Sequence, residues 1–178
     1  MNQISINTTM NWMMDAHEGQ YRMDGRPYCV HPLSVYTTIS KYSQDDGVLK
    51  AALLHDVIED CDHDFNSING VFGIRVAELV RDLTNDPDRI KLMGKPAYMA
   101  DKIKNMNDEA LLIKLADRLD NVSDMALLSD SFVKGYVEET LRIVGTLFTE
   151  RSRFTEGHMH LLKRIVSTLP SGKRAGGS

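Results

Sequence analysis

His55 and Asp56 stand side by side in the chain, and two further carboxylates follow at Glu59 and Asp60. The surrounding run from Lys50 is rich in Leu and Ala and contains no Gly or Pro, so it predicts a helix. At about 100° per residue, His55 and Glu59 lie one turn apart, as do Asp56 and Asp60. Burying neighbouring anions without partners is unfavourable by several kcal/mol. A divalent cation at this face of the helix is the simplest explanation.

Two other segments offer ligands that would complete such a site. His31 lies in the run YCVHP at 28–32, and Asp117 lies in KLADRL at 114–119. Together with His55 and Asp56 they form a mixed nitrogen and oxygen set, which suits Mn, Fe, Zn or Ni better than Ca or Mg. Such a set leaves coordination positions for water and a substrate oxygen. That arrangement supports hydrolysis.

The composition limits the class of protein. The chain has 178 residues, of which 42% are hydrophobic, and this is ordinary for a single globular domain. We expect that domain to span residues 1–169, followed by a disordered tail at 170–178 where Gly and Ser accumulate. The formal net charge of −4 argues against a general nucleic-acid binder, but it leaves an anionic small substrate open.

The chain also carries few signals of location. No apolar run approaches the roughly 18 residues of a membrane span. The first five residues contain no basic or apolar signal segment. Cys29 and Cys61 are the only thiols, which favours free cysteines in a reducing compartment. We therefore expect a cytoplasmic protein that contacts neither membranes nor nucleic acid.

The pattern of apolar residues predicts an all-α protein, with no convincing strand alternation and no repeat. Thr8 or Thr9 is the expected N-cap of the first helix, and residues 85–95 are expected to form a loop because they contain Pro87 and Gly94. The helices are expected near 8–23, 31–41, from the turn at 45–47 to Asp62, then near 66–72, 73–83, 96–106, 108–127, 130–150 and 155–168.

The expected helix at 108–127 carries a polar stripe beside its apolar face. Lys114, Asp117, Asn121 and Asp124 recur at spacings that keep them on one side of a helix. Asp117 can therefore face a metal while Lys114 and Asn121 point toward the same cavity. For Asp124, a solvated position is the simpler interpretation.

Four segments, in order, resemble the motifs of the hydrolase domain of RelA/SpoT homologues. They are AHEGQYR at 16–22 with GRPY at 25–28 and HP at 31–32, AALLHD at 51–56 followed by ED at 59–60, FG at 72–73 with 80–84, and KLADRL at 114–119 with Asn121. The chain ends before a synthetase domain could fit. It therefore resembles the small stand-alone alarmone hydrolases of the HD phosphohydrolase superfamily.

The resemblance implies an all-α HD fold with a metal site in its helical core. It implies one Mn²⁺ per chain, with other divalent transition metals as alternatives, and a guanine nucleotide as substrate. The implied reaction removes the 3′-pyrophosphate from ppGpp or pppGpp, which yields GDP or GTP and pyrophosphate. By position, the residues that match the family's metal ligands are His31, His55, Asp56 and Asp117.

The resemblance also assigns roles around that metal. Glu59 and Asp60 match the acidic pair needed for hydrolysis, and they would orient or deprotonate the attacking water. Arg22 matches a residue that packs against the guanine base, and Asn121 matches one that contacts the nucleotide. His17 is expected to hydrogen-bond around the site rather than to bind the metal.

Further cations and an aromatic residue are candidates for substrate contact. Four lysines are candidates for an anion entrance, although exposed helical lysines are common: Lys91, Lys95, Lys102 and Lys104. Of these, substrate contact is expected for Lys91 or Lys95. Lys114 would offset charge that develops on the phosphate. Tyr136 would close the phosphate pocket, with a structural role as the alternative. The remaining histidines are expected at the surface, namely His63, His158 and His160.

Two departures from the family pattern leave the choice of substrate open. Met23 stands where a basic residue is common, and Asp120 stands where His or Tyr is common. One alternative is therefore another HD phosphohydrolase, acting on a nucleoside monophosphate or on the 2′-phosphate of NADPH. The segment at 16–22 disfavours the monophosphate but not NADPH. A non-catalytic nucleotide-binding regulator is the other alternative, and the pair Glu59–Asp60 argues against it.

Overall fold

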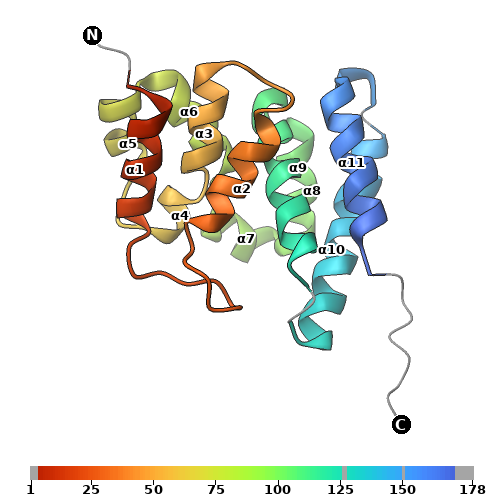
Figure 1. Cartoon of the computed structure of the whole chain (residues 1–178). Coiled ribbons are helices and arrows are strands. Elements are labelled where there is room, and N and C mark those ends of the chain that lie inside the picture. Colours follow the sequence, from red (N-terminus) through yellow and green to blue (C-terminus); the bar gives the residue numbers. More distant parts are fainter. Residues whose placement is uncertain (1–3, 126–127, 150, 171–178) are drawn as a thin grey trace.

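The computed structural model describes residues 4–125, 128–149 and 151–170, and in these ranges the chain is built from helices without a strand (Figure 1). The helices are α1 (Ile6–Ala16), α2 (Val30–Ile39), α3 (Asp46–Leu54), α4 (Val57–Asp60), α5 (Phe65–Phe72), α6 (Ile74–Leu83), α7 (Pro87–Met93), α8 (Lys95–Asn105), α9 (Asp108–Ser123), α10 (Asp130–Phe148), the 3₁₀ turn η2 (Arg151–Arg153) and α11 (Glu156–Thr168). The predicted all-α class is confirmed.

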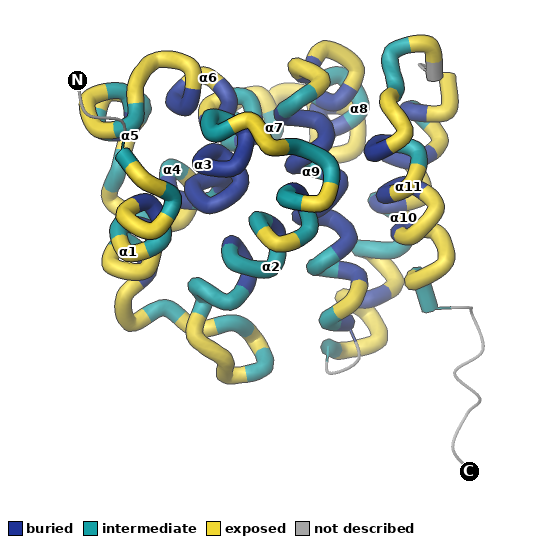
Figure 2. Tube along the Cα trace, turned by 45° about the horizontal axis from the view of Figure 1, so that its top comes forward, coloured by how far each residue is buried: buried dark blue, intermediate teal, exposed yellow. Residues whose placement is uncertain are grey.

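The core forms around α3 and α9. Every residue from Val48 to Leu54 is buried, and α9 is buried along most of its length from Ala110 to Val122. Helices α2, α3, α6 and α11 all pack against α9. Figure 2 shows long buried stretches of the trace in these two helices, with exposed residues on the outer parts of the molecule. Side chains on the inner faces of α2, α3 and α9 therefore meet inside the bundle.

The ends of the helices follow ordinary capping chemistry. Ser5 caps α1 by accepting from the Thr8 N–H, so the expectation of Thr8 or Thr9 as the cap is wrong. Helix α1 ends at Ala16 and not near residue 23, because the chain turns there into a loop with an isolated bridge between Tyr21 and Pro27. This loop carries the chain back to α2.

The segment at 85–95 is not the loop expected from the sequence. It contains α7, which begins at Pro87, and the Asp86 side chain caps it by accepting from the Arg89 N–H. Proline at the first position of a helix is favourable, since its missing N–H would have no partner there. Gly94, at φ 77°, then separates α7 from α8. Pro87 and Gly94 therefore mark the ends of a short helix and not a loop.

The run around His55 is not one continuous helix. Helix α3 ends at Leu54, His55 follows as its C-cap, and α4 begins only at Val57. On a continuous helix, adjacent side chains project about 100° apart. The bend instead lets His55 and Asp56 approach each other, with 3.1 Å between His55 Nε2 and Asp56 Oδ2.

The expectations for His158, for the two cysteines and for the C-terminal tail can be compared with the structure in turn. His158 is buried and not at the surface, because its Nδ1 takes part in the capping box of α11 and its Nε2 lies 2.8 Å from the carbonyl oxygen of Asp108. Cys29 and Cys61 are free thiols, as expected. Among the described residues, no helix is long and apolar enough to cross a membrane. The expected tail lies outside the described residues from 171 onward, and the proposed domain boundary stays a prediction.

Candidate active site

Three buried side chains from three helices meet at the centre of the bundle. His31 lies in the first turn of α2, His55 caps the C-terminus of α3, and Asp117 lies in the middle of α9. One potential ligand atom from each lies within 4.8 Å of the others. The two imidazole Nε2 atoms are 3.3 Å apart, and His31 Nε2 is 3.3 Å from Asp117 Oδ1. This grouping of nitrogen and oxygen donors is suited to a metal ion.

Asp56 joins this cluster from the bend between α3 and α4. Its Oδ2 lies 3.1 Å from His55 Nε2 and 3.5 Å from His31 Nε2. The structure thus brings together the four side chains named as candidate metal ligands from the sequence, although they come from segments up to 86 residues apart (31 to 117).

The hydrogen bonds of the two histidines test whether this cluster fits a cation. His55 Nδ1 lies 2.9 Å from the Ala52 carbonyl oxygen, and His31 Nδ1 lies 2.6 Å from Asp120 Oδ2. Both partners accept hydrogen bonds, so each Nδ1 is the protonated nitrogen. In the neutral tautomers, both Nε2 lone pairs then face each other and two carboxylates. A divalent transition metal fits this donor set, since it replaces lone-pair repulsion by coordination.

The same geometry shifts the pKa values of the ligands. Burial lowers the pKa of His31, but hydrogen bonds to Asp117 and Asp120 outweigh burial and raise that pKa to about 9. Burial raises the pKa of Asp117, but the Lys114 ammonium and the imidazoles outweigh it and hold that pKa well below its usual range. Lys114 Nζ lies 2.9 Å from Asp117 Oδ2. Excess negative charge in the cluster therefore attracts either a proton or a metal.

Asp60 is positioned at the edge of the cluster by Tyr28. The Tyr28 hydroxyl oxygen lies 2.8 Å from Asp60 Oδ2 and 2.7 Å from Asp56 Oδ2, so it links the metal cluster to the acidic pair. The His17 ring stacks on Tyr28 with 4.7 Å between ring centroids, and His17 Nδ1 lies 2.8 Å from Gln20 Oε1. His17 thus packs behind Tyr28, in the supporting position expected for it.

Among the described residues, the hydrogen bonds to the Glu59 carboxylate come from Asn85. The backbone N–H of Asn85 donates to Glu59 Oε1, and Asn85 Nδ2 lies 3.1 Å from Glu59 Oε2. Glu59 and Asp60 both border the cavity above the metal cluster. The two carboxylates can therefore reach a water molecule that lies between the cluster and the cavity.

This cavity has a volume of about 380 Å³ and is walled by the loop after α1 and by α4, α8, α9 and α10. Five of the six residues named as substrate contacts line it, namely Arg22, Lys95, Lys114, Asn121 and Tyr136. Lys91 does not, since it is exposed on α7. The structure thus gathers the candidate contacts around one space and leaves Lys91 outside its wall.

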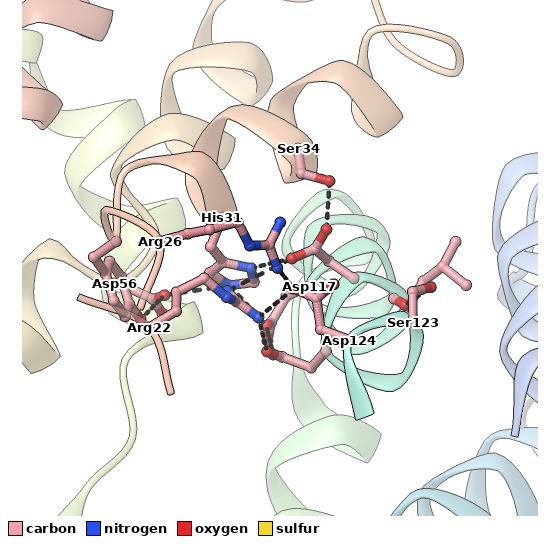
Figure 3. A network of polar contacts seen from close by, with 12 residues as sticks. Arg22, Arg26, His31, Ser34, Asp56, Asp117, Ser123 and Asp124 are labelled. Atoms are coloured by element: carbon pink, nitrogen blue, oxygen red, sulfur yellow. Dashed lines mark hydrogen bonds and ion pairs between the residues drawn. The ribbon is translucent and has the colours of Figure 1, made fainter. Parts of the chain in front are cut away.

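The loop after α1 is tied to the end of α9 by charged groups (Figure 3). Arg22 Nη2 lies 3.1 Å from Asp124 Oδ2 and 3.3 Å from Asn121 Oδ1. Arg26 Nη2 lies 2.6 Å from the same Asp124 oxygen. The sequence led us to expect a solvated Asp124. That expectation is wrong, because Asp124 pairs with both arginines and lines the cavity.

The opposite wall is built from α8, α9 and α10. The Arg118 guanidinium lies 4.3 Å from the centroid of the Tyr136 ring and donates to Glu139 at 2.7 Å. Lys95 Nζ lies 2.9 Å from the other oxygen of Glu139. Two cations and an aromatic ring thus border the cavity, with one carboxylate between the cations.

Sequence reasoning missed several residues that build this site. Asp120 holds His31 by the 2.6 Å contact and also accepts from the Ser34 hydroxyl, whereas the motif comparison marked it only as a departure. Its position three residues after Asp117 in α9 was the available signal. Tyr28 stands three residues before His31, which was a similar signal. Asn85 and Glu139 had none, since their partners are distant in sequence.

Comparison with known proteins identifies the class. Residues 9–151 match the family described as HD domain, so the chain belongs to the HD domain family. A solved structure described as a metazoan orthologue of SpoT that hydrolyses ppGpp superposes with a TM-score of 0.75 at 30% identity, covering 91% of this chain and 93% of that one. The predicted resemblance to the SpoT-type hydrolase domain and to its HD fold is confirmed.

Relatives known by sequence belong to the same group. The guanosine-3′,5′-bis(diphosphate) 3′-pyrophosphohydrolase of Vibrio cholerae is 38% identical over 139 residues, which are 75% of this chain. The bifunctional (p)ppGpp synthase/hydrolase SpoT of Escherichia coli K12 is 37% identical over 139 residues. In both cases the match covers 20% of the relative, so this chain spans about a fifth of these longer proteins.

Proposed function

We propose that this chain hydrolyses the 3′-pyrophosphate of ppGpp and pppGpp to GDP or GTP and pyrophosphate. The observation that carries the proposal is the cluster of His31, His55, Asp56 and Asp117 at the base of a 380 Å³ cavity that Glu59 and Asp60 border. Binding alone does not require such an acidic pair. The metazoan SpoT orthologue, whose fold this chain shares over nearly its whole length, is described as hydrolysing ppGpp.

The proposed cofactor is one Mn²⁺ per chain, held by the four ligands named above. When bound, the ion would supply Lewis-acid chemistry, which activates water and offsets charge on the phosphate. Imidazole nitrogens combined with carboxylate oxygens support a transition metal over Ca²⁺ or Mg²⁺. The Asp120–His31 and Ala52–His55 contacts orient both imidazoles toward the centre of the cluster before any ion arrives.

The chain's own residues have separate tasks in this proposal. Glu59 or Asp60 accepts a proton from the attacking water, since both carboxylates border the cavity beside the cluster. Lys114 and Arg118 line the same cavity and offset charge on the phosphorus-bound oxygens. The phosphorus that is attacked is the one attached to the ribose 3′ oxygen.

The nucleotide is proposed to lie along the cavity, with its base near Arg22 and Asn121. A planar guanidinium stacks well on a purine, and Arg22 is already fixed by Asp124. Lys95 and Tyr136 line the opposite wall and would contact phosphate groups. A contact with Lys91 would require a substrate group that extends beyond the cavity.

The location proposed for this protein is the cytoplasm. Two free cysteines, which fit a reducing compartment, support it.

One alternative substrate is favoured by a specific observation. Met23 lines the cavity where a basic residue is common in the family, and this residue is 75% exposed. Apolar packing at that position does not distinguish guanine from adenine. The 2′-phosphate of NADPH is therefore the second candidate for the phosphate group that this site removes.

The test is a substrate panel on the purified chain. With ppGpp and Mn²⁺ we expect GDP and pyrophosphate in equal amounts, separated by anion-exchange chromatography, and we expect a chelator to abolish the reaction. NADPH, pppGpp and guanosine monophosphates complete the panel. Release of single orthophosphates from ppGpp would show that the bond assignment is wrong. Turnover of NADPH without turnover of ppGpp would favour the alternative, and binding without any turnover would favour a regulator.

A further inference from the structure

Lys102 lies outside the catalytic cavity, yet its ammonium group is directed toward the segment that holds Glu59. Its Nζ lies 2.8 Å from the carbonyl oxygen of Leu83, 2.5 Å from that of Thr84 and 3.3 Å from Asn85 Oδ1. A lysine ammonium has three donors, and these contacts use all of them. Burial lowers the pKa of Lys102 to about 8, with the neighbouring Lys114 acting in the same direction. Such hydrogen bonds are needed to offset the loss of water.

The contact with Lys102 determines which way the Asn85 side chain is turned. The ammonium of Lys102 only donates, so the Asn85 amide oxygen faces it. The amide nitrogen then faces the opposite direction, where it lies 3.1 Å from Glu59 Oε2. A carboxylate only accepts, so the flipped amide would lose both contacts. Lys102 therefore selects the amide orientation that binds Glu59.

The position of the Glu59 carboxylate depends on Asn85, whereas the neighbouring Asp60 has a different partner. Glu59 is exposed and lies on α4, a single turn of helix, and both hydrogen bonds of its carboxylate in the described chain come from Asn85. Asp60 instead has the Tyr28 hydroxyl at 2.8 Å. Without Asn85, the Glu59 side chain would sample several rotamers.

Asn85 connects two separate spaces in the molecule. It lines the catalytic cavity, and it also lines a second cavity of about 570 Å³ that Lys102, Tyr98 and Arg89 border. Lys102 therefore acts from behind the wall that carries Glu59 and has no place in the catalytic cavity itself.

We propose that Lys102 is a positioning residue for hydrolysis, which holds the Glu59 carboxylate beside the metal cluster through Asn85. The inference rests on the proposed function, because Glu59 is one of the two carboxylates assigned there to the attacking water. A purely structural role would be to cap the last carbonyl groups of α6, where a cation is favourable. The two roles differ in what the removal of the ammonium does to kcat.

The experiment compares Lys102→Met with a matched control one turn earlier in α8. Tyr98→Phe removes the hydroxyl to which the Asp86 N–H donates at 2.8 Å, and it leaves Asn85 and Glu59 untouched. We expect Lys102→Met to lower kcat about 10-fold with KM unchanged, as is typical when a supporting hydrogen bond is lost. Lys102→Arg should restore part of kcat. Tyr98→Phe should lower the unfolding temperature and leave kcat unchanged.

A double-mutant cycle shows whether Lys102 acts through Glu59. In a Glu59→Gln background, we expect Lys102→Met to cause no further loss of kcat. Equal loss in both backgrounds would overturn the proposal, as would an unchanged kcat in the single variant. If Lys102→Met does not fold, Lys102→Gln serves the same comparison, because its amide cannot donate to all three acceptors.

A crystal structure of Lys102→Met gives a readout that does not depend on activity. We expect the metal cluster to be retained while the Asn85 amide nitrogen loses its contact with Glu59 Oε2. If the Asn85 amide nitrogen still donates to Glu59 in that variant, the positioning role is wrong. If wild-type chain does not release pyrophosphate from ppGpp, the proposed function fails, and the crystal structure alone decides whether Lys102 positions Glu59.

Discussion

Two regions of the site are built in opposite ways. One is the metal cluster, and the other is the mouth of the cavity, by which we mean the lining residues Tyr21, Arg22, Met23, Lys95, Asp124 and Glu139. His31, His55 and Asp117 are 2%, 1% and 6% exposed, and each is part of the helical core or its edge. At the mouth, Tyr21 and Met23 are 67% and 75% exposed on a loop. The cluster is thus set within close-packed helices, whereas the mouth is bordered by side chains that face water.

The contacts that hold the two regions also differ. In the cluster, each imidazole is oriented by a buried or half-buried acceptor behind it. At the mouth, the main ties are ion pairs, Arg22 with Asp124 and Lys95 with Glu139. Ion pairs near water contribute about 0–1 kcal/mol each. We infer from this difference that the side chains of the cluster are preorganised for one chemistry, whereas the side chains at the mouth can rearrange around the substrate. Changes in the cluster should therefore abolish activity, and changes at the mouth should tune it.

The largest effect is expected from His55→Ala. This variant removes one Nε2 from the cluster and leaves the acceptor of Ala52 without its donor, so we expect loss of metal and of all measurable turnover. Metal content by atomic emission and pyrophosphate release are the measurements. His160→Ala is the matched control, because His160 is exposed and lies outside the cluster, with its Nδ1 2.8 Å from the Tyr42 hydroxyl. Full metal content in His55→Ala would show that the cluster does not bind the ion as proposed.

Glu59→Gln should separate chemistry from metal binding. The amide keeps the size of the side chain but cannot accept a proton, so we expect kcat to fall about 100- to 10,000-fold, the usual contribution of a general base. Metal content should remain that of wild type, since Glu59 is not in the cluster. Glu138→Gln, at an exposed position of α10, is the control. A variant that keeps its kcat would leave Asp60 as the proton acceptor.

The cluster could be predicted from the sequence for a physical reason. The four candidate ligands are polar residues within largely apolar sequence segments, namely His31, His55, Asp56 and Asp117. Polar side chains that are buried need partners, and imidazoles combined with carboxylates indicate a metal ion as that partner. The bend after Leu54 could not be predicted, because the pattern there has no Gly or Pro. The bend is instead associated with the tertiary contacts of His55 and Asp56, whose side chains meet His31 and Asp117.

The region around Glu59 was less predictable. Its anchor Asn85 is 26 residues away and lies in a segment that the sequence assigned to a loop. Lys102 was a candidate for an anion entrance, but it does not line the cavity, and nothing in the pattern of α8 places its ammonium at the end of α6. Contacts of this kind depend on how helices pack, which periodicity does not encode.

Metal binding should depend on pH through His31. Its pKa is raised from 6.5 to about 9, so His31 carries a proton at pH 7.5 when no metal is bound. A ligand nitrogen must lose that proton, so binding should release about one proton, and apparent affinity should rise up to tenfold per pH unit until about pH 9. Calorimetry in buffers of different ionisation enthalpy measures the release. Binding at pH 7.5 with no proton release would contradict the prediction.

His31 should also make the free energy of unfolding of the metal-free protein depend on pH, but this free energy should fall as pH rises. A raised pKa means that folding favours protonated His31, so this contribution is complete below pH 6.5 and is lost as pH rises through about 9. Asp120→Asn serves as the control, because it removes one of the carboxylates that raise the pKa. Proton release and the loss of stability should both become smaller in that variant.

The smallest effect is expected at the mouth, from Arg22→Ala. Stacking of a guanidinium on a purine contributes about 0.5–1 kcal/mol at an exposed site and more when desolvated, and the Arg22 side chain is only 12% exposed, so KM should rise at least roughly 2- to 5-fold. Because this contact lies away from the scissile bond and is equal in ground and transition states, kcat should change less. Arg26→Ala is the matched control: Arg26 also contacts Asp124, at 2.6 Å, but does not line the cavity. We expect it to leave KM unchanged. A lower kcat with unchanged KM in Arg22→Ala would place Arg22 with the phosphate chemistry, and the mouth would then belong with the cluster as a preorganised region.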